Sequence, residues 1–288
     1  MKTLAIALLV LLPSVASAAS PEQTYLAARD AKIREMVAAE KKLGADGSLK
    51  LHERAVADLE GKLKQLIGLS ALAVPGVGKT PKANYEALTP DDMGYGMLDG
   101  LVYWSKDYKT RVVVTTEGLF RAWLHDKDKG LPEDPAKAVT HATFYTQAVN
   151  SDATMSKYAD LPIKKPAAAT FAVAMLAGWA QDTGPWEPDE VVLSVMQGGK
   201  LYVVRVPAGA KIGAIPACKA LWDEAMKKRE KNAERLRANP KAPDMTMQIE
   251  NEGEAAYQRC YRERAPKEKG FAELVRQAQA IADTLPAK

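Results

Sequence analysis

Cysteine, histidine and phenylalanine are scarce in this chain of 288 residues, which contains two, three and four of them. Cys218 and Cys260 are far apart in the sequence, so no C-x-x-C redox motif is present. None of His52, His125 and His141 lies in an H-E-x-x-H motif or in a pair with zinc-ligand spacing. The sequence therefore names no catalytic residue, metal ligand or cofactor, although a site assembled from distant residues stays open.

A large excess of either charge is also missing. The chain has 40 lysines and arginines against 36 acidic residues, a formal net charge of +4. Nucleic-acid-binding domains normally carry a marked basic excess or stripe, so we expect no nucleic-acid partner. After residue 18 the longest apolar stretch, residues 167–180, has fourteen residues. A membrane-spanning helix needs about 20, so we interpret this stretch as core and expect no transmembrane segment in the mature protein.

The first 18 residues are typical of a secretory signal peptide. Lys2 precedes an apolar run from Leu4 to Leu12, and Ala16-Ser17-Ala18 fits a small-x-small cleavage site. No cysteine follows the run to accept a lipid. We therefore expect a soluble protein that is exported to the periplasm or secreted, in an envelope of the bacterial type.

Helical signals dominate residues 19–69. Ser20-Pro21-Glu22-Gln23 is a capping box with proline at the first helical position, which predicts a helix start. Apolar residues then recur at helical spacing before and after Gly44. This pattern predicts two antiparallel helices joined by a short loop.

The middle of the chain, residues 70–213, has a mixed pattern. β-branched and aromatic residues predict strands at 111–116 and at 143–149, and the spacing of apolar residues predicts a helix after Thr116. We interpret His141, two residues before the second run, as the point where the chain enters a strand. Gly198-Gly199 separates two β-rich runs, which predicts a hairpin with a two-residue turn. One face of this hairpin is apolar and the other mixed, so we expect the second face to be partly covered or to carry a helix.

The last part, residues 214–288, returns to helix. We expect one helix from Pro216 to Asn239-Pro240, a second from Met245 to Arg264, and a third after Pro266. Cys218 and Cys260 are equally distant from residue 239, so they lie side by side if the first two helices form an antiparallel hairpin. A disulfide between them fits an oxidising compartment better than a reactive thiol does.

One segment resembles a nucleotide-binding P-loop, the stretch AVPGVGKT at residues 73–80. A working P-loop continues from Gly-Lys-Thr into a helix and uses the next backbone N–H to hold phosphate. Here the next residue is Pro81, which has no N–H and disfavours helical geometry at Thr80. We interpret the stretch as a turn in which Thr80 caps a helix starting at Pro81, a pattern repeated at Thr89-Pro90.

A basic run at residues 227–237 is the candidate binding surface. Its members are Lys227, Lys228, Arg229, Lys231, Arg235 and Arg237, with Glu230 and Glu234 among them. The favoured interpretation is a solvated helix face with ion pairs inside the helix. The alternative is a surface that binds anionic lipid, peptidoglycan or an acidic partner.

Three further patterns are weaker. Residues 126–134 begin like a calcium loop but lack its glycine and its final carboxylate, and Ser70 lacks the second glycine of G-x-S-x-G. The aromatic residues Tyr103, Trp104, Tyr108 and Trp186 suit a ligand cleft or, more commonly, core packing.

We interpret His52 as a partly exposed helix residue and His125 as the end of a helix, where a cation suits the dipole.

Together these patterns predict an α+β fold with an N-terminal helical hairpin, a central mixed region that contains a small antiparallel sheet, and C-terminal helices joined by one disulfide. The segments are residues 1–18, 19–69, 70–213 and 214–288, and the last three are expected to form one composite body. We expect the protein to bind an envelope protein or a small ligand. A hydrolase that acts on an envelope polymer through acidic residues is the competing class.

Overall fold

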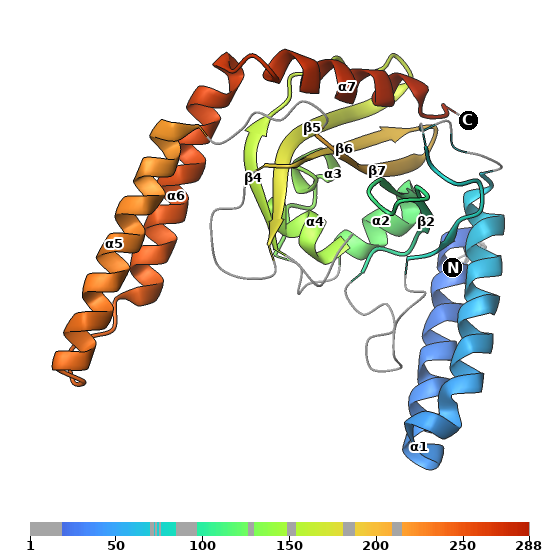
Figure 1. Ribbon diagram of the computed structural model, residues 1–288. Helices are drawn as coiled ribbons and strands as arrows, with labels where there is room; N and C mark the ends of the chain where they lie inside the picture. Colours follow the sequence, from blue (N-terminus) through green and yellow to red (C-terminus); the bar gives the residue numbers. More distant parts are fainter. Residues whose placement is uncertain are drawn as a thin grey trace, which may run out of the picture.

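A seven-stranded antiparallel sheet forms the centre of the described structure (Figure 1). The computed structural model describes residues 19–69, 72, 74, 76–84, 97–125, 130–148, 154–180, 188–208 and 215–287, and only the backbone of residues 45–48, 154, 179 and 180. The signal peptide expected at residues 1–18 lies outside this part of the chain. The strands are β1 (Lys82–Ala83), β2 (Leu101–Trp104), β3 (Arg111–Thr116), β4 (Thr154–Asp160), β5 (Ala169–Ala180), β6 (Glu190–Gln197) and β7 (Lys200–Pro207). Their order across the sheet is β1-β2-β3-β7-β6-β5-β4.

The β6–β7 hairpin confirms the predicted turn and register. Gly198 and Gly199 have φ angles of 56° and 70°, the left-handed region that this turn needs and that glycine adopts without strain. Val191 pairs with Val206 across the hairpin. The face that carries these two valines packs into one hydrophobic core, and the opposite face packs into a second.

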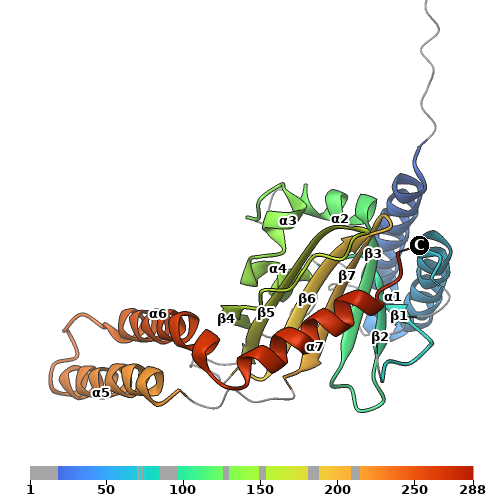
Figure 2. The same ribbon diagram turned by 90° about the horizontal axis from the view of Figure 1, so that it is seen from above.

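Helices cover both faces of the sheet, as Figure 2 shows. On one face lie α2 (Glu117–Leu124), α3 (Pro135–Ala138) and α4 (Ala142–Ala148). On the other lies α7 (Phe271–Thr284), whose stripe of Leu274, Ala278 and Ile281 packs on the sheet together with the base of α1. The helix predicted after Thr116 and the final helix are both confirmed.

The strand predicted at residues 143–149 is wrong, because Ala142–Ala148 form α4. Phe144, Tyr145 and Ala148 are buried at helical spacing against the sheet. This amphipathic pattern outweighs the strand preference of the individual residues. His141 consequently precedes a helix, and its carbonyl accepts a hydrogen bond from the backbone N–H of Phe144 at 3.1 Å.

The N-terminal hairpin is confirmed. Its two helices lie side by side in Figure 1 and are joined at Gly44, which has a non-helical φ of 73° inside α1 (Pro21–Ile67). The capping box forms as predicted: the backbone N–H of Gln23 donates to the Ser20 hydroxyl at 3.1 Å, and the Gln23 side chain accepts from the backbone of Ser20 at 2.9 Å. We call this hairpin the N-terminal arm.

The C-terminal region contains α5 (Pro216–Ala238) and α6 (Thr246–Arg264), followed by a short 3-10 helix, η3 (Ala265–Lys267), and then α7. We call the α5–α6 pair the C-terminal arm. The α+β class, the helical N-terminus and the disulfide-linked C-terminal helices are all as predicted. The sheet is larger than its one visible hairpin suggested, because pairing between distant strands leaves little trace in the sequence.

Candidate functional site

The two arms are anchored at opposite edges of the sheet and project to the same side of it (Figure 1). The N-terminal arm contacts β1, β2 and β3, whereas the C-terminal arm contacts β4 at the far edge through α6. Helix α5 packs along α6. The sheet therefore holds two helical hairpins whose outward-facing residues are exposed.

An ion pair between the half-buried Arg29 and the buried Asp99 fixes the base of the N-terminal arm. Asp99, just before β2, accepts hydrogen bonds from the Tyr25 hydroxyl at 3.0 Å and from the Arg29 guanidinium. Burial raises the pKa of Asp99, and the charge of Arg29 offsets part of this rise. Burial alone lowers the pKa of Arg29, but the carboxylates of Asp99 and Asp30 outweigh it, so the pKa is raised. The ion pair therefore offsets part of the cost of burying Asp99.

Further contacts hold the base of the same arm through both of its helices. The Glu60 carboxylate accepts from the backbone N–H of Ala83 at 3.1 Å, which ties the helix to β1. Gly118 faces the side chain of Glu22, and a Cβ at this glycine comes within 2.9 Å of it. The arm is therefore seated on the sheet at several points along its base.

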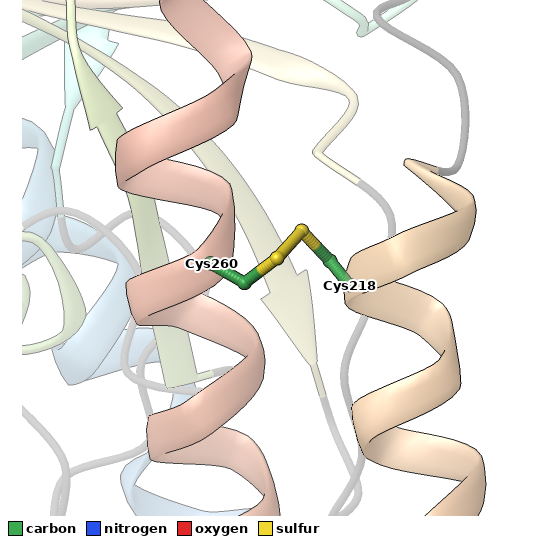
Figure 3. The surroundings of a disulfide bond; sticks show 2 residues. All are labelled: Cys218 and Cys260. Carbon is green, nitrogen blue, oxygen red and sulfur yellow. A yellow bond between two sulfur atoms is a disulfide. The ribbon is translucent and has the colours of Figure 1, made fainter.

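The predicted disulfide fixes the base of the C-terminal arm. Cys218 of α5 and Cys260 of α6 have their Cα atoms 5.5 Å apart and are bonded, as Figure 3 shows. The bond closes the open end of the helical hairpin, as expected from the equal distances to residue 239. A formed disulfide fits a compartment outside the cytoplasm.

Tyrosines join this arm to the sheet beside the disulfide. Tyr158 of β4 packs edge-on against Tyr257 and Tyr261 of α6, with ring centroids 6.0 and 5.3 Å apart. Ser156 of β4 donates to the Glu254 carboxylate at 3.1 Å. The sequence does not predict this contact, because nothing local links β4 to α6.

Gly253 allows the two helices of the C-terminal arm to approach closely. A Cβ built at this position lies 2.4 Å from the Cβ of Ala225 and 3.4 Å from the Trp222 ring. Real Cβ atoms do not come this near to each other, so the helix separation depends on the glycine.

The basic run lies on the exposed surface of α5, where all six of its basic residues are exposed. The ion pairs expected with Glu230 and Glu234 are wrong for the described residues. Lys228 pairs instead with Glu224 at 2.9 Å. Arg229 pairs with the buried Glu250 of α6 at 2.8 Å.

The remaining members of the run differ in their surroundings. Arg235 donates to the Asn232 side chain at 2.7 Å and to the Pro243 carbonyl, which holds the turn between α5 and α6. Among the described residues, the side chains of Lys227, Lys231 and Arg237 have no ion pair or hydrogen bond, although the charge of Lys227 helps to lower the pKa of Glu224. The run is therefore a mixture of structural and free cations.

The distal ends of both arms carry exposed apolar side chains. Leu43 and Leu49 are 52% and 55% exposed beside the bend of the N-terminal arm, and Leu51 follows at 37%. Met247 is 62% exposed at the start of α6, beside the bend of the C-terminal arm. Sequence patterns did not single out these residues, since a lone leucine in a helix does not reveal which side is solvent.

A shallow groove of about 310 Å³ runs along the N-terminal arm. Met36, Leu51 and Ala55 form its apolar part, and charged residues surround them: Lys32, Glu35, Arg54 and Asp58. Lys32 and Glu35 pair with each other at 3.1 Å. The groove therefore offers an apolar strip rather than converging catalytic groups.

The histidines contribute no cluster to this surface. His52 is buried, 6% exposed, so the expected partial exposure is wrong: it continues the inward stripe of Ala55 and Leu59. Its Nδ1 atom has no hydrogen-bond partner among the residues that the structure describes. His125 ends α2 as predicted, and its backbone N–H donates to Arg121. In the described ranges no group of three or more histidine, cysteine or acidic residues could hold a metal ion.

The described residues of the stretch that resembles a P-loop, 74 and 76–80, lie at the edge of the sheet, where Val77 forms an isolated bridge with Ser105. Thr80 and Pro81 lead directly into β1, so the expected helix start at Pro81 is wrong. The backbone N–H of Gly78 donates to the Trp104 carbonyl at 2.8 Å, which commits it to the sheet. The second cap expected at Thr89-Pro90 lies outside the described residues.

The weaker candidates have structural surroundings where they are described. Asp134 accepts from the backbone N–H of Ala136 and caps α3, while residues 126–129 of the supposed calcium loop lie outside the described part. Tyr103 is buried in the core, and Arg111 stacks on the Trp104 ring at 4.8 Å beside the exposed Tyr108. Ser70 and Trp186 are also outside the described residues.

Within the described ranges no helix is long and apolar enough to cross a bilayer. The chain matches no family model, no curated protein and no solved structure. No relative therefore indicates a function, and the two arms are the structural feature that bears on it.

Proposed function

We propose that this protein is exported to the periplasm or secreted, and that it binds an envelope partner through its two helical arms rather than catalysing a reaction. One observation carries the proposal: two helical hairpins whose outward-facing residues are exposed project to the same side from opposite edges of one sheet (Figure 1). The partner is a protein or a ligand. A hydrolase that uses acidic residues is the competing class.

The way the arms are held supports this proposal. The Arg29–Asp99 ion pair holds the base of the N-terminal arm on the sheet. In the C-terminal arm the Cys218–Cys260 disulfide joins the two helices, and Tyr158 of β4 packs on α6. Binding through rigid elements avoids part of the conformational entropy cost of association, because the surface is ordered beforehand. Two contact regions on one molecule also raise the effective concentration of the second contact once the first has formed.

Position-specific photocrosslinking in the native envelope tests the proposal. A photoreactive residue replaces exposed Glu53 of the N-terminal arm or exposed Lys231 of the C-terminal arm, and exposed Lys137 of α3 is the matched control on the body. We expect one reproducible adduct from both arm positions and none from Lys137. Adducts from Lys137 alone, or turnover of an envelope polymer by the purified protein, contradict the proposal.

A further inference from the structure

Exposed apolar side chains gather at the two ends that project furthest from the sheet. The described residues contain six exposed large apolar side chains: Leu43, Leu49, Leu51, Tyr108, Leu221 and Met247. The first three follow one another around the bend of the N-terminal arm, and Met247 lies at the bend of the C-terminal arm. We call residues 41–51 the N-terminal tip and residues 237–247 the C-terminal tip.

Basic residues outnumber acidic ones in both tips, where Asp46 and Asp244 are the acidic members. Lys41, Lys42 and Lys50 are exposed in the N-terminal tip. Arg237 and Lys241 are exposed in the C-terminal tip, where the Asp244 carboxylate is engaged by the Asn232 side chain and by Thr246. Both tips therefore present apolar groups with cations beside them.

This combination is what the interface of an anionic bilayer binds. Apolar side chains enter the boundary between headgroups and acyl chains, while lysines and arginines stay at the level of the anionic headgroups. A few side chains on a bend form too small a patch for a stable protein interface, which needs about 800 Å² from each partner. A bilayer sets no such requirement, because it deforms around each inserted side chain.

We propose that the two tips contact one anionic lipid surface together, with Leu43, Leu49 and Met247 entering the interface. The arms point to the same side of the sheet, so the body does not separate the tips from a common surface (Figure 1). Each tip alone binds weakly, and the two together bind more tightly because the second contact is intramolecular. This inference rests on the proposed binding role of the arms and identifies the surface that the ends of the arms bind.

Vesicle co-sedimentation tests the inference on the full mature chain. The vesicles contain equal parts of phosphatidylcholine and phosphatidylglycerol, and pure phosphatidylcholine is the neutral comparison. We expect binding to the anionic vesicles that weakens with salt. We expect Leu43→Ser/Leu49→Ser and Met247→Ser each to weaken it, and the triple variant to bind at least about tenfold more weakly.

Two matched variants give the controls. Leu221→Ser removes an exposed leucine near the disulfide, away from both tips, and must leave vesicle binding unchanged. Lys227→Gln/Lys231→Gln removes two free cations from the middle of α5. If the Lys227→Gln/Lys231→Gln variant loses vesicle binding and the tip variants do not, the C-terminal arm binds through the exposed face of α5 and the inference is overturned.

The remaining outcomes separate this inference from the proposed function. Wild-type protein that fails to sediment with anionic vesicles overturns the lipid contact, while protein adducts from Glu53 and Lys231 still support the arms as binding elements. Tip variants that abolish those adducts without vesicle binding assign the tips to a protein. Vesicle binding without any adduct supports the lipid contact and contradicts a protein partner.

Discussion

At the scale of single residues, buried polar groups decide how the arms are seated. Asp99 is 4% exposed and depends on Arg29, whereas the buried Nδ1 of His52 has no hydrogen-bond partner among the described residues. Buried charges are costly unless they are paired, so a single substitution in the Arg29–Asp99 pair should strongly reduce the stability of the fold. The sequence shows both residues but not their pairing, because they are 70 positions apart.

Arg29→Met should reduce the free energy of unfolding by about 2–4 kcal/mol at neutral pH, since it leaves a buried carboxylate without its cation. The loss should depend on pH. Burial already raises the pKa of Asp99, and removal of the Arg29 charge raises it further. A carboxyl group with a raised pKa destabilises the fold only above its unfolded pKa of about 3.9.

The loss of unfolding free energy in Arg29→Met relative to the wild type should therefore be small near pH 4. It should grow as pH rises through the raised pKa of Asp99. Urea unfolding at several pH values measures it. Adding Asp99→Asn removes the unpaired charge and should recover part of the loss at neutral pH. An equal deficit at acid and neutral pH would show that the ion pair is not the cause.

At the scale of elements, local signals predicted helices and turns well. The Ser20 cap, the Gly198-Gly199 turn and the disulfide-linked hairpin depend on residues close in sequence or on simple helix geometry. The wrong predictions at residues 143–149 and at Pro81 concern segments whose conformation depends on contacts far away in the sequence. In both, packing or pairing with a distant strand selects the conformation.

The C-terminal arm should depend on Gly253. Gly253→Ala should destabilise the protein by about 1–2 kcal/mol, because the overlap with Ala225 outweighs the better helix propensity of alanine. Thermal unfolding measures the change. Hydrogen exchange should also show faster opening of α5.

Two variants control this prediction. Adding Ala225→Gly to Gly253→Ala restores the space and should recover stability. Gly61→Ala, in α1 where nothing lies within 4 Å of the added Cβ, should stabilise by about 0.5–1 kcal/mol. Equal gains at both glycines would refute the close approach.

At the scale of the whole molecule, the stability resides in the sheet, and the arm ends are open to the surroundings. The sheet has hydrophobic cores on both faces, one of which also contains residues from the bases of both arms. The distal parts of the arms bury little beyond their own helix seams. Surface that contributes little to folding is free to carry function.

Replacing a leucine by alanine should therefore change the free energy of unfolding much more in the sheet core than at the N-terminal tip. Leu193→Ala, in the sheet core at 1% exposure, should cost about 2–5 kcal/mol, and Leu49→Ala at the N-terminal tip should change stability by less than about 0.5 kcal/mol. Denaturant unfolding of both variants measures this. A large loss at Leu49 would mean that the tip is covered in solution.

The α+β class, the helical ends, the hairpin and the disulfide follow from the amino-acid sequence, because periodicity, capping and turn chemistry act over a few residues or one helix pair. The seven-strand order, the Arg29–Asp99 anchor and the direction of the arms are visible only in the folded chain. These features depend on contacts between residues far apart in the chain. The same contacts set the direction of the arms and thereby bring both tips to one side of the sheet, where we expect the protein to bind.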